Sequence, residues 1–319
     1  MSLASKFDTQ TELLARELEE ILTPLSNVSD LYSLIKEPLN VQGRIAPLTN
    51  SQKPWPILPL AVAESICGEY EQAVPAALAL QLLMVAGDVF DDIEDCDTPD
   101  SISSKNGPAI ATNIGTTLLI LAEKALTRLK TKGINDAITL QVIEKVNSYF
   151  TKSCVGQHLD LSSSLLNLSE DKYLEMVALK SASQIECACY AGAALSTTEE
   201  QIITMFSVFG HNLGMAAQIS NDIMGIVTER DIAKRKITLP VIFALNHSDD
   251  VSKSIATKAY NPMIANEIHA DQIKTILFNS GAVQYSSLQM TLYQEYAKEA
   301  LTDIQKLGIS VASLGYFLN

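Results

Sequence analysis

Apolar residues recur along most of this chain at the three- and four-residue spacing that places them on one face of a helix. The first such segment is 9–25, where leucines and an isoleucine stand between charged residues and Pro24 lies near the end. The same spacing predicts eight further helices, at 57–67, 71–95, 109–129, 137–163, 173–195, 199–229, 238–245 and 288–307. Since no segment shows the two-residue alternation of a strand, the sequence predicts an all-α protein.

The composition agrees with a large helical core. The chain has 319 residues, of which 47% are hydrophobic and only 6% aromatic. Leucine, alanine and isoleucine dominate, as helix packing favours. Five prolines between residues 38 and 59 interrupt helix formation, but no stretch resembles an interdomain linker. We therefore predict a single domain over residues 1–319.

The charge and the cysteines narrow the choice of partner and compartment. A net charge of -14 argues against nucleic acid or an anionic membrane as partner, so an anionic substrate would need a metal ion. Five cysteines without paired metal-site spacing are typical of free thiols in the cytoplasm. Residues 1–20 lack a secretory signal, and the longest apolar run, 73–87, is too short to span a bilayer. We expect a cytoplasmic protein with no transmembrane segment.

A dense acidic cluster follows the apolar part of segment 71–95. Six carboxylates fall within residues 88–97, and a helix would place four of them on one stripe: Asp88, Asp91, Asp92 and Asp95. Carboxylates this close repel one another and raise one another's pKa. Oxygen ligands one turn apart suit Mg²⁺, which typically bridges carboxylates and substrate phosphates. A solvated acidic face is an equally good interpretation of this stripe alone.

A second polar stripe lies in segment 199–229. Asn221, Gly225 and Glu229 stand at i, i+4 and i+8, with Asp222 beside them and Gln218 one turn earlier. We predict that this stripe faces the first across a cleft. Basic residues follow directly and would hold the far side of an anionic ligand: Arg230, Lys234, Arg235 and Lys236. A metal ion held between the two acidic stripes, together with basic residues on the far side of the ligand, is an arrangement that binds a diphosphate.

Three other polar positions allow two interpretations each. Gln157 and Asp160 are i, i+3 neighbours that can meet a common ligand or each other. Lys180 lies within an apolar segment, where a lysine often only extends its ammonium to solvent. Trp55, the single tryptophan, belongs to the core packing or to a substrate wall.

The acidic motifs carry a family resemblance. Asp91-Asp92-Ile93-Glu94-Asp95 resembles the first DDxxD motif of trans-isoprenyl diphosphate synthases, the polyprenyl synthetase family, and Gln218 with Asn221-Asp222 resembles the start of the second. Weaker similarities follow in the family's order at 156–160, 180–181, 231–240, 280–282 and 296–298. The resemblance covers nearly the whole chain.

This resemblance implies a fold, a cofactor and a set of roles. The fold would be an isoprenoid synthase-type helical bundle around a central cavity, usually in a homodimer. Three Mg²⁺ ions would grip the diphosphate of an allylic prenyl substrate. The metal ligands would be Asp91, Asp92, Asp95 and Asp222. Lys180 and Lys236 would hold diphosphate oxygens, and further substrate contacts would come from Gln157, Asp160, Gln218 and Arg235.

Other positions depart from the family pattern. Members that add isopentenyl diphosphate have a basic early motif, a histidine before the acidic helix end and an arginine pair after DDxxD. This chain has Gln52, Lys53 and Trp55 at the first, Met84 at the second and residues 98–105 at the third. Without those donors a second diphosphate would be poorly compensated. The departures weaken an ordinary chain-elongation activity.

The second stripe is also similar to the NDxxSxxxE motif of class I terpene synthases, with Gly225 at the serine position. That similarity implies Asn221 and Glu229 as metal ligands, with a water in place of the missing hydroxyl. Residues 231–236 are similar to ComQ-type enzymes, which prenylate a peptide tryptophan. Small residues at Ala86 and Gly87, where short-chain members place bulky ones, predict a pocket for a C15 or longer tail.

The sequence therefore predicts a Mg²⁺-dependent isoprenoid synthase that ionises an allylic prenyl diphosphate and transfers the prenyl group with little or no use of isopentenyl diphosphate. One alternative is a class I terpene synthase that releases diphosphate from a C15 to C20 substrate. Another is a non-catalytic partner subunit of a prenyl diphosphate synthase, which the missing basic site would allow. The intact acidic motif, with Glu229 and Lys236, argues against the last.

Overall fold

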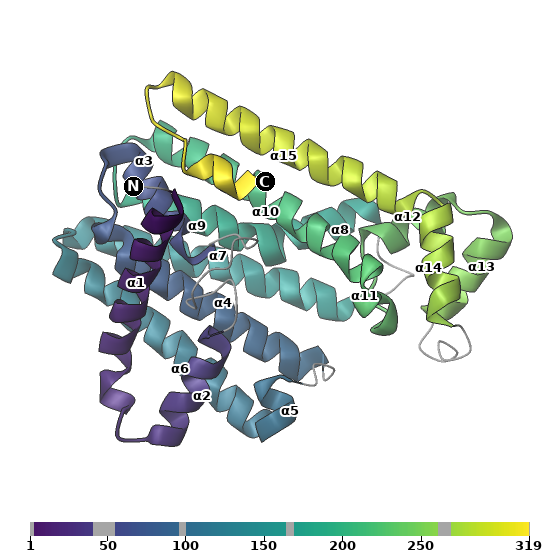
Figure 1. The fold of residues 1–319 in the computed structure, drawn as a ribbon, viewed down its shortest axis with the longest axis horizontal. Helices are drawn as coiled ribbons and strands as arrows, with labels where there is room; N and C mark the ends of the chain where they lie inside the picture. The colour runs from purple at the N-terminus through teal and green to yellow at the C-terminus, as the bar shows by residue number, and fades with distance from the viewer. Residues whose placement is uncertain (1–2, 41–54, 96–99, 164–168, 261–268, 319) are drawn as a thin grey trace. The chain divides into compact units, whose positions relative to one another are not determined.

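The computed structural model describes residues 3–40, 55–95, 100–163, 169–260 and 269–318. Within those ranges every regular element is helical, which confirms the predicted all-α class (Figure 1). The longer helices are α1 (Leu3–Leu22), α2 (Ser29–Leu39), α3 (Leu58–Cys67), α4 (Val74–Asp95), α6 (Pro108–Thr127), α7 (Asp136–Ser162), α9 (Ser183–Ala194), α10 (Glu200–Val227), α13 (Asp250–Ala259), α14 (Ala270–Asn279) and α15 (Ala282–Lys306). Shorter ones are α5 (Ile102–Asn106), α8 (Glu170–Val177), α11 (Arg230–Ala233) and α12 (Leu239–His247).

The described chain forms two compact units, and neither is continuous in sequence. Unit 1 contains residues 1–150, 186–210 and 300–319, and unit 2 contains residues 151–185 and 211–299. Helices α7, α9, α10 and α15 each contribute residues to both units. The single domain over residues 1–319 stays a prediction.

Unit 1 is organised around α4. Almost every residue from Val74 to Ala86 on this helix is buried, because the segment is apolar on nearly all faces. Helix α6 packs against it, and the ring of Phe90 lies so close to Gly115 of α6 that a Cβ there would be 2.7 Å from the ring. The small residue permits this approach, and the packing of Phe90 fixes the rotation of the helix end that carries the acidic stripe.

Unit 2 has two neighbouring cores. One joins α8, α10 and α12 through Tyr173, Met215, Ile219 and Leu239. The other lies beneath the C-terminal end of α10 and includes Ile226, Ile232, Val241 and Tyr260. Both cores use the buried face of α10, so that helix holds the second polar stripe in place.

The predicted helices are all present, with some changes at their ends. Helix α10 ends at Val227, two residues before the predicted end at Glu229. The sequence pattern missed α2, α13 and α14, whose apolar stripes are short and interrupted by polar residues. The stretch 173–195, predicted as one helix, includes a π-helical turn at Ala178–Ala182 between α8 and α9.

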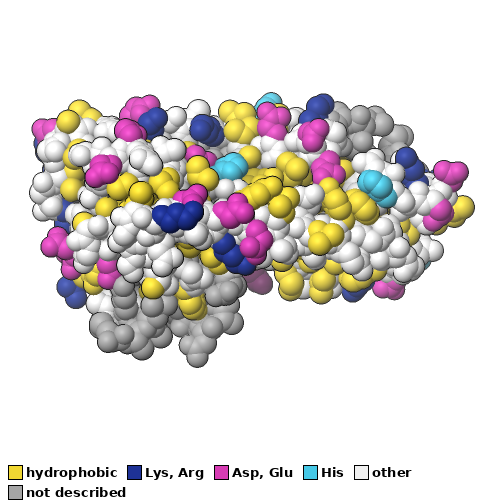
Figure 2. Space-filling model, turned by 90° about the horizontal axis from the view of Figure 1, so that it is seen from above, with side chains coloured by type: hydrophobic (Ala, Val, Ile, Leu, Met, Phe, Trp, Pro, Cys, Tyr) yellow, Lys and Arg dark blue, Asp and Glu magenta, His cyan; other side chains and the backbone are white. Residues whose placement is uncertain are grey.

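Three helical stretches are long and apolar enough, by length and composition, to cross a membrane: Glu71–Glu94, Pro108–Lys132 and Glu200–Val227. The apolar run 73–87 is part of a longer helical stretch that includes the acidic residues after Gly87, so its own length does not decide the matter. In the first stretch 78% of the most apolar window is buried inside the protein. That burial is typical of a core helix. Figure 2 shows acidic, basic and apolar side chains interspersed on the face it draws.

Candidate active site

The first acidic stripe lies at the C-terminal end of α4, in unit 1. Asp88 is exposed, and Asp91 and Asp92 are half-buried. Asp95 is the last residue of the helix, and its side chain lies outside the described residues, as do Gln52 and Lys53. The helix therefore places Asp88, Asp91 and Asp92 on one side, as their spacing predicts.

Within the described part of the chain, no three histidine, cysteine, aspartate or glutamate side chains lie close enough to hold a metal ion among themselves. Mg²⁺ rarely needs such a cage, because it keeps several waters and binds through one or two carboxylates together with substrate phosphates. Two half-buried aspartates one residue apart, Asp91 and Asp92, offer that kind of donor. These residues fit a Mg²⁺ ion that is shared with a diphosphate.

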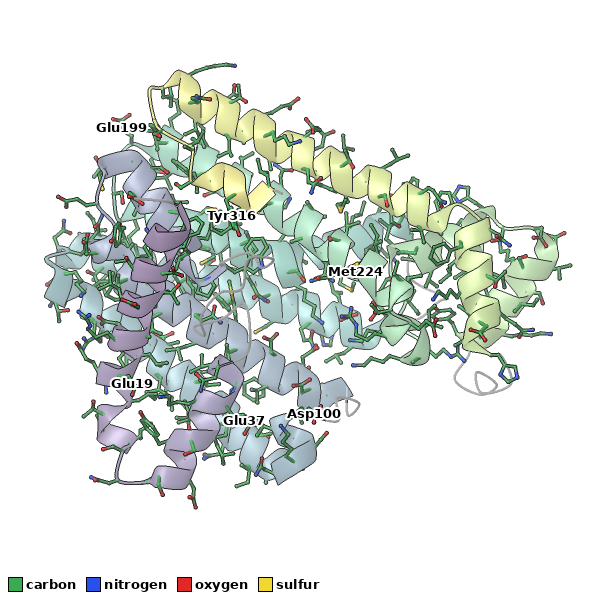
Figure 3. All side chains as sticks on the ribbon, in the orientation of Figure 1. Glu19, Glu37, Asp100, Glu199, Met224 and Tyr316 are labelled. Atoms are coloured by element: carbon green, nitrogen blue, oxygen red, sulfur yellow. The ribbon has the colours of Figure 1, made fainter. Side chains whose placement is uncertain are left out.

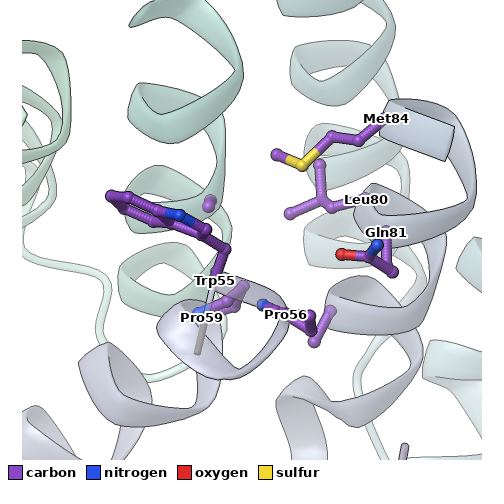
Figure 4. A pocket seen from close by; sticks show the side chains of 8 residues that line it. Trp55, Pro56, Pro59, Leu80, Gln81 and Met84 are labelled. Atoms are coloured by element: carbon purple, nitrogen blue, oxygen red, sulfur yellow. The ribbon is translucent and has the colours of Figure 1, made fainter. Parts of the chain in front are cut away.

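A small pocket of about 10 Å³ lies in unit 1 on α4 (Figure 4). Its lining residues are Trp55, Pro56, Pro59, Ala77, Leu80, Gln81, Met84 and Ala188. Met84 and Asp88 are separated by one helical turn, so the pocket and the stripe follow one another along α4. Apart from the amide of Gln81, the lining is almost entirely apolar. This arrangement suits a hydrocarbon that continues from a charged head group.

The ring of Trp55 packs 6.0 Å from the ring of Phe317 and also lines this pocket, and its part in a substrate wall stays a prediction. Ala86 and Gly87, by contrast, are not among the lining residues. Ala86 is fully buried, whereas Gly87 is exposed with open space where a Cβ would lie. Their role in accommodating the tail stays a prediction.

In unit 2, Asp222 is held on the buried side of the second stripe. Only 3% of its surface is exposed, and its carboxylate accepts hydrogen bonds from the hydroxyl of Tyr173 and from Nε2 of Gln218, the latter at 3.0 Å. The hydroxyl of Ser181 reaches Oε1 of Gln218 at 2.9 Å. Burial raises the pKa of Asp222 to about 7, against the effect of the two hydrogen bonds. Asn221, its neighbour, is exposed.

Gly225 does not leave room for a water. A Cβ at this position would lie 1.9 Å from Oδ2 of Asp231, so the space of the missing serine is already filled by a carboxylate. Asp231 is in turn paired with Arg230, at 2.8 Å between Oδ1 and Nε. The expectation that a water replaces the hydroxyl was therefore wrong, because α11 folds back and places Asp231 there.

Glu229 does not continue the helical stripe. It follows the end of α10 with a left-handed backbone, at φ 62°, and precedes α11. Its carboxylate pairs with Nζ of Lys274 on α14 at 2.6 Å, and the same ammonium donates to the carbonyl of Val227 at 3.3 Å. As a metal ligand Glu229 would have to share its oxygens with this lysine.

Lys180 lies on the π-helical turn and pairs with Asp160 at 2.6 Å. Helix α7 approaches this turn closely, since a Cβ at Gly156 would lie 2.3 Å from the backbone nitrogen of Lys180. The side chain of Lys180 is 25% exposed. Gln157, one residue after the glycine, is half-buried. Asp160 thus fixes the ammonium of Lys180 at the surface of unit 2.

Lys236 and Arg235 follow α11 and are half-buried. The backbone nitrogen of Lys236 donates to the carbonyl of Asp231 at 2.9 Å, and Arg235 has a left-handed backbone at φ 54°. Within unit 2 the structure thus brings together three groups: Asp160 with Lys180, Gln218 with Asp222, and Arg230 with Asp231. No local pattern predicts the roles of Tyr173 or Lys274, because their partners lie 49 and 45 residues away.

Residues 53–277 match the polyprenyl synthetase family. The chain belongs to this family. As a member, it is 30% identical over 243 residues to a tryptophan prenyltransferase ComQ of Bacillus subtilis subsp. natto, covering 75% of this chain and 72% of that protein. It is 29% identical over 224 residues to a geranylgeranyl diphosphate synthase of Mycobacterium tuberculosis, covering 65% of this chain but only 63% of that protein.

The fold agrees with the family. A crystal structure of geranylgeranyl pyrophosphate synthase from Corynebacterium glutamicum, in complex with isoprenyl diphosphate and magnesium, matches with a TM-score of 0.79. The match covers 100% of this chain and 97% of that one at 17% identity. The predicted isoprenoid synthase-type helical fold is confirmed.

Proposed function

We propose that this member of the polyprenyl synthetase family is a Mg²⁺-dependent enzyme that ionises an allylic prenyl diphosphate and transfers the prenyl group. The observation that carries the proposal lies on a single helix. On α4 an apolar pocket ends at Met84, and one turn later the carboxylates of Asp88, Asp91 and Asp92 begin. An apolar wall that leads into oxygen ligands fits a lipid diphosphate, whose tail is apolar and whose head group binds metal.

In this proposal Asp91 and Asp92, with Asp95, hold Mg²⁺ together with the substrate diphosphate. When bound, Mg²⁺ supplies positive charge to the leaving diphosphate oxygens. In unit 2, Asn221 and Asp222 with Glu229 serve as the other metal ligands, and Gln157, Gln218 and Arg235 contact the substrate. The proposal also includes three Mg²⁺ ions, as the family resemblance implies. It further includes a homodimeric protein located in the cytoplasm.

The cations of unit 2 would bind the departing diphosphate. Asp160 anchors Lys180 at 2.6 Å, so the ammonium is oriented before the substrate arrives and less entropy is lost on binding. Lys236 would provide a second donor. The apolar lining of the unit 1 pocket would exclude water from the allylic carbon after the diphosphate leaves, which protects the cation from hydrolysis.

The acceptor is proposed to be a group other than isopentenyl diphosphate. Where members that add isopentenyl diphosphate have a basic motif, a histidine and an arginine pair, this chain has Gln52, Lys53 and Trp55, then Met84, then residues 98–105. A second diphosphate would therefore be poorly compensated. The 30% identity to a tryptophan prenyltransferase supports an acceptor of a different kind. A terpene cyclase is less well supported, because the space of the serine in its NDxxSxxxE motif is filled here by Asp231 at Gly225.

Product analysis tests the proposal. The purified protein is incubated with C10, C15 and C20 allylic diphosphates and Mg²⁺, with and without isopentenyl diphosphate, and diphosphate and prenyl products are measured. We expect Mg²⁺-dependent diphosphate release and prenyl transfer to a supplied indole-containing peptide. A cyclic hydrocarbon formed without co-substrate would favour the cyclase. Absence of release with every substrate, together with tight binding to a competent synthase, would favour the partner subunit.

A further inference from the structure

Gly225 marks a notch in α10 that the side chain of Asp231 fills. A Cβ on this glycine would lie 1.9 Å from Oδ2 and 2.2 Å from Cγ of Asp231, and real Cβ atoms never approach a neighbour so closely. The backbone of Gly225 is ordinary helix, so the position requires a missing side chain and not an unusual conformation. Asp231 has a side chain only 5% exposed. A buried carboxylate and a glycine thus depend on each other.

The carboxylate in the notch has one described charge partner, Arg230. Nε of Arg230 lies 2.8 Å from Oδ1 of Asp231, and its Nη2 donates to the backbone carbonyl of Asn221 at 3.4 Å. The contact with Asp231 raises the pKa of Arg230, so the guanidinium stays charged. Both contacts fix the plane of the group beside the exposed residue Asn221 of the second stripe.

Arg230 nevertheless keeps 55% of its side chain exposed. A guanidinium has five N–H donors, and the two described contacts use only Nε and Nη2. Because these contacts occupy one edge of the guanidinium, the other edge can bind an anion. The planar arrangement of N–H donors in a guanidinium matches the oxygens of a phosphate group.

We propose that Arg230 binds the diphosphate of the allylic substrate and that Asp231, seated in the notch at Gly225, is the residue that positions it. The inference rests on the proposed function. Where a serine at position 225 would offer a hydroxyl oxygen to a metal ion, this chain offers a guanidinium to the diphosphate. The segment that directly follows the second stripe therefore contributes positive charge to the diphosphate site.

The test is isothermal titration calorimetry of the full-length protein with inorganic diphosphate in the presence of Mg²⁺. Arg230→Gln removes the cation, and Gly225→Ala forces Asp231 out of the notch. We expect each change to weaken diphosphate binding by roughly 10-fold or more, the scale of a charge-assisted hydrogen bond. The double variant should bind about as weakly as either single one, because both changes act through the same guanidinium.

Two further variants separate positioning from folding. Gly225→Ala/Asp231→Ala removes the clash, so thermal unfolding should recover toward the wild type while diphosphate affinity stays low. Asp231→Asn keeps the shape in the notch and removes the ion pair, so it should lower affinity by several-fold with little change in unfolding temperature. Lys306→Gln, which breaks an exposed pair with Asp303 at 2.8 Å, is the matched control and should bind like the wild type.

The outcomes distinguish this inference from the proposed function. If the wild type binds diphosphate with Mg²⁺ and Arg230→Gln binds equally well, the inference is wrong and the function stands. If Gly225→Ala alone loses affinity, the notch is only structural and the inference is equally wrong. If the wild type itself binds no diphosphate in the presence of Mg²⁺, the proposed function fails.

Discussion

The stripe at the end of α4 and the stripe at the end of α10 have similar spacing in the sequence but different surroundings in the structure. On α4 the helix continues regularly to Asp95, and Asp88, Asp91 and Asp92 share its exposed or half-buried side. At the end of α10 the helix stops at Val227, and the acids beyond it are paired with Arg230 and Lys274. The difference teaches that spacing alone predicts a shared face only while the helix lasts.

The two regions are therefore expected to have different roles. The stripe on α4 offers oxygen atoms for a metal, and the region after α10 offers cations whose positions are fixed by nearby carboxylates. We therefore expect substitutions on α4 to affect metal-dependent chemistry, and substitutions in unit 2 to affect diphosphate affinity and stability.

The largest effect is expected at the first stripe. Asp91→Asn keeps the shape of the side chain and removes the charge that would hold Mg²⁺, so the stabilisation of the leaving diphosphate is lost. We expect kcat to fall by roughly 10²–10³-fold, the scale seen when one group that stabilises developing charge is removed. Steady-state diphosphate release at saturating Mg²⁺ measures it. An unchanged kcat would contradict the assignment of metal binding to the stripe on α4.

The second prediction concerns Asp222, whose folded pKa of about 7 exceeds its ordinary value of 3.8. Because the folded pKa is raised, the contribution of Asp222 to stability is fully present below about pH 4 and is lost as the pH rises through 7, where the buried carboxyl must ionise. The loss is at most roughly 4 kcal/mol, at 1.36 kcal/mol per pKa unit. Urea unfolding of the metal-free protein at pH 4 to 8 measures this slope.

Asp222→Asn should remove that slope. The asparagine can still accept a hydrogen bond from Tyr173 and donate one to a flipped Gln218, so the fold should be more stable than the wild type at pH 8. A variant that is less stable at pH 8 would show that the carboxylate is favourable in its buried site, in contrast to the direction of its pKa.

The third prediction sharpens the role of the pocket beside the first stripe. From Asp91 back to Ala77 the helix rises by about 21 Å, at 1.5 Å per residue, and the pocket residues lie along this path. Ala77→Phe, at a position only 1% exposed, should lower stability through overpacking. It should also block the far end of the pocket and shift preference toward shorter allylic diphosphates by about 10-fold, as judged by kcat/KM. Ala86→Phe, at a fully buried position, tests the tail position predicted from the sequence. It should destabilise the fold by about 1–3 kcal/mol through overpacking.

If Ala86→Phe instead changed the chain-length preference at unchanged stability, the sequence-based pocket would be right and the path along Met84 and Ala77 would be wrong. Measured product lengths and thermal unfolding of the two variants decide between these paths.

The smallest effect is expected at the pair in unit 2. Lys180→Gln leaves Asp160 without its cation and removes one diphosphate donor, so KM for the allylic substrate should rise by several-fold to about 10-fold while kcat changes less. Asp160→Asn, which only loosens the ammonium, should give a smaller rise. Equal losses in kcat and kcat/KM would assign Lys180 to the transition state instead of to binding.

The sequence predicted the helices with strong apolar periodicity and both acidic motifs, because those patterns are local. It could not predict the fate of Glu229, since that depends on where α10 ends and on Lys274, 45 residues later. It also missed Tyr173, which reads as an ordinary core aromatic until α8 is packed against α10. The filling of Gly225 by Asp231 follows from a left-handed residue at 229 that no spacing rule anticipates.

The most direct measurement of the central claim is diphosphate release from a C15 allylic diphosphate as a function of Mg²⁺, for the wild type and for Asp91→Asn. The account predicts release by the wild type that rises with Mg²⁺ and disappears on chelation, with at least a 10²-fold loss in the variant. Release that is independent of Mg²⁺, or equal in the two proteins, would contradict it.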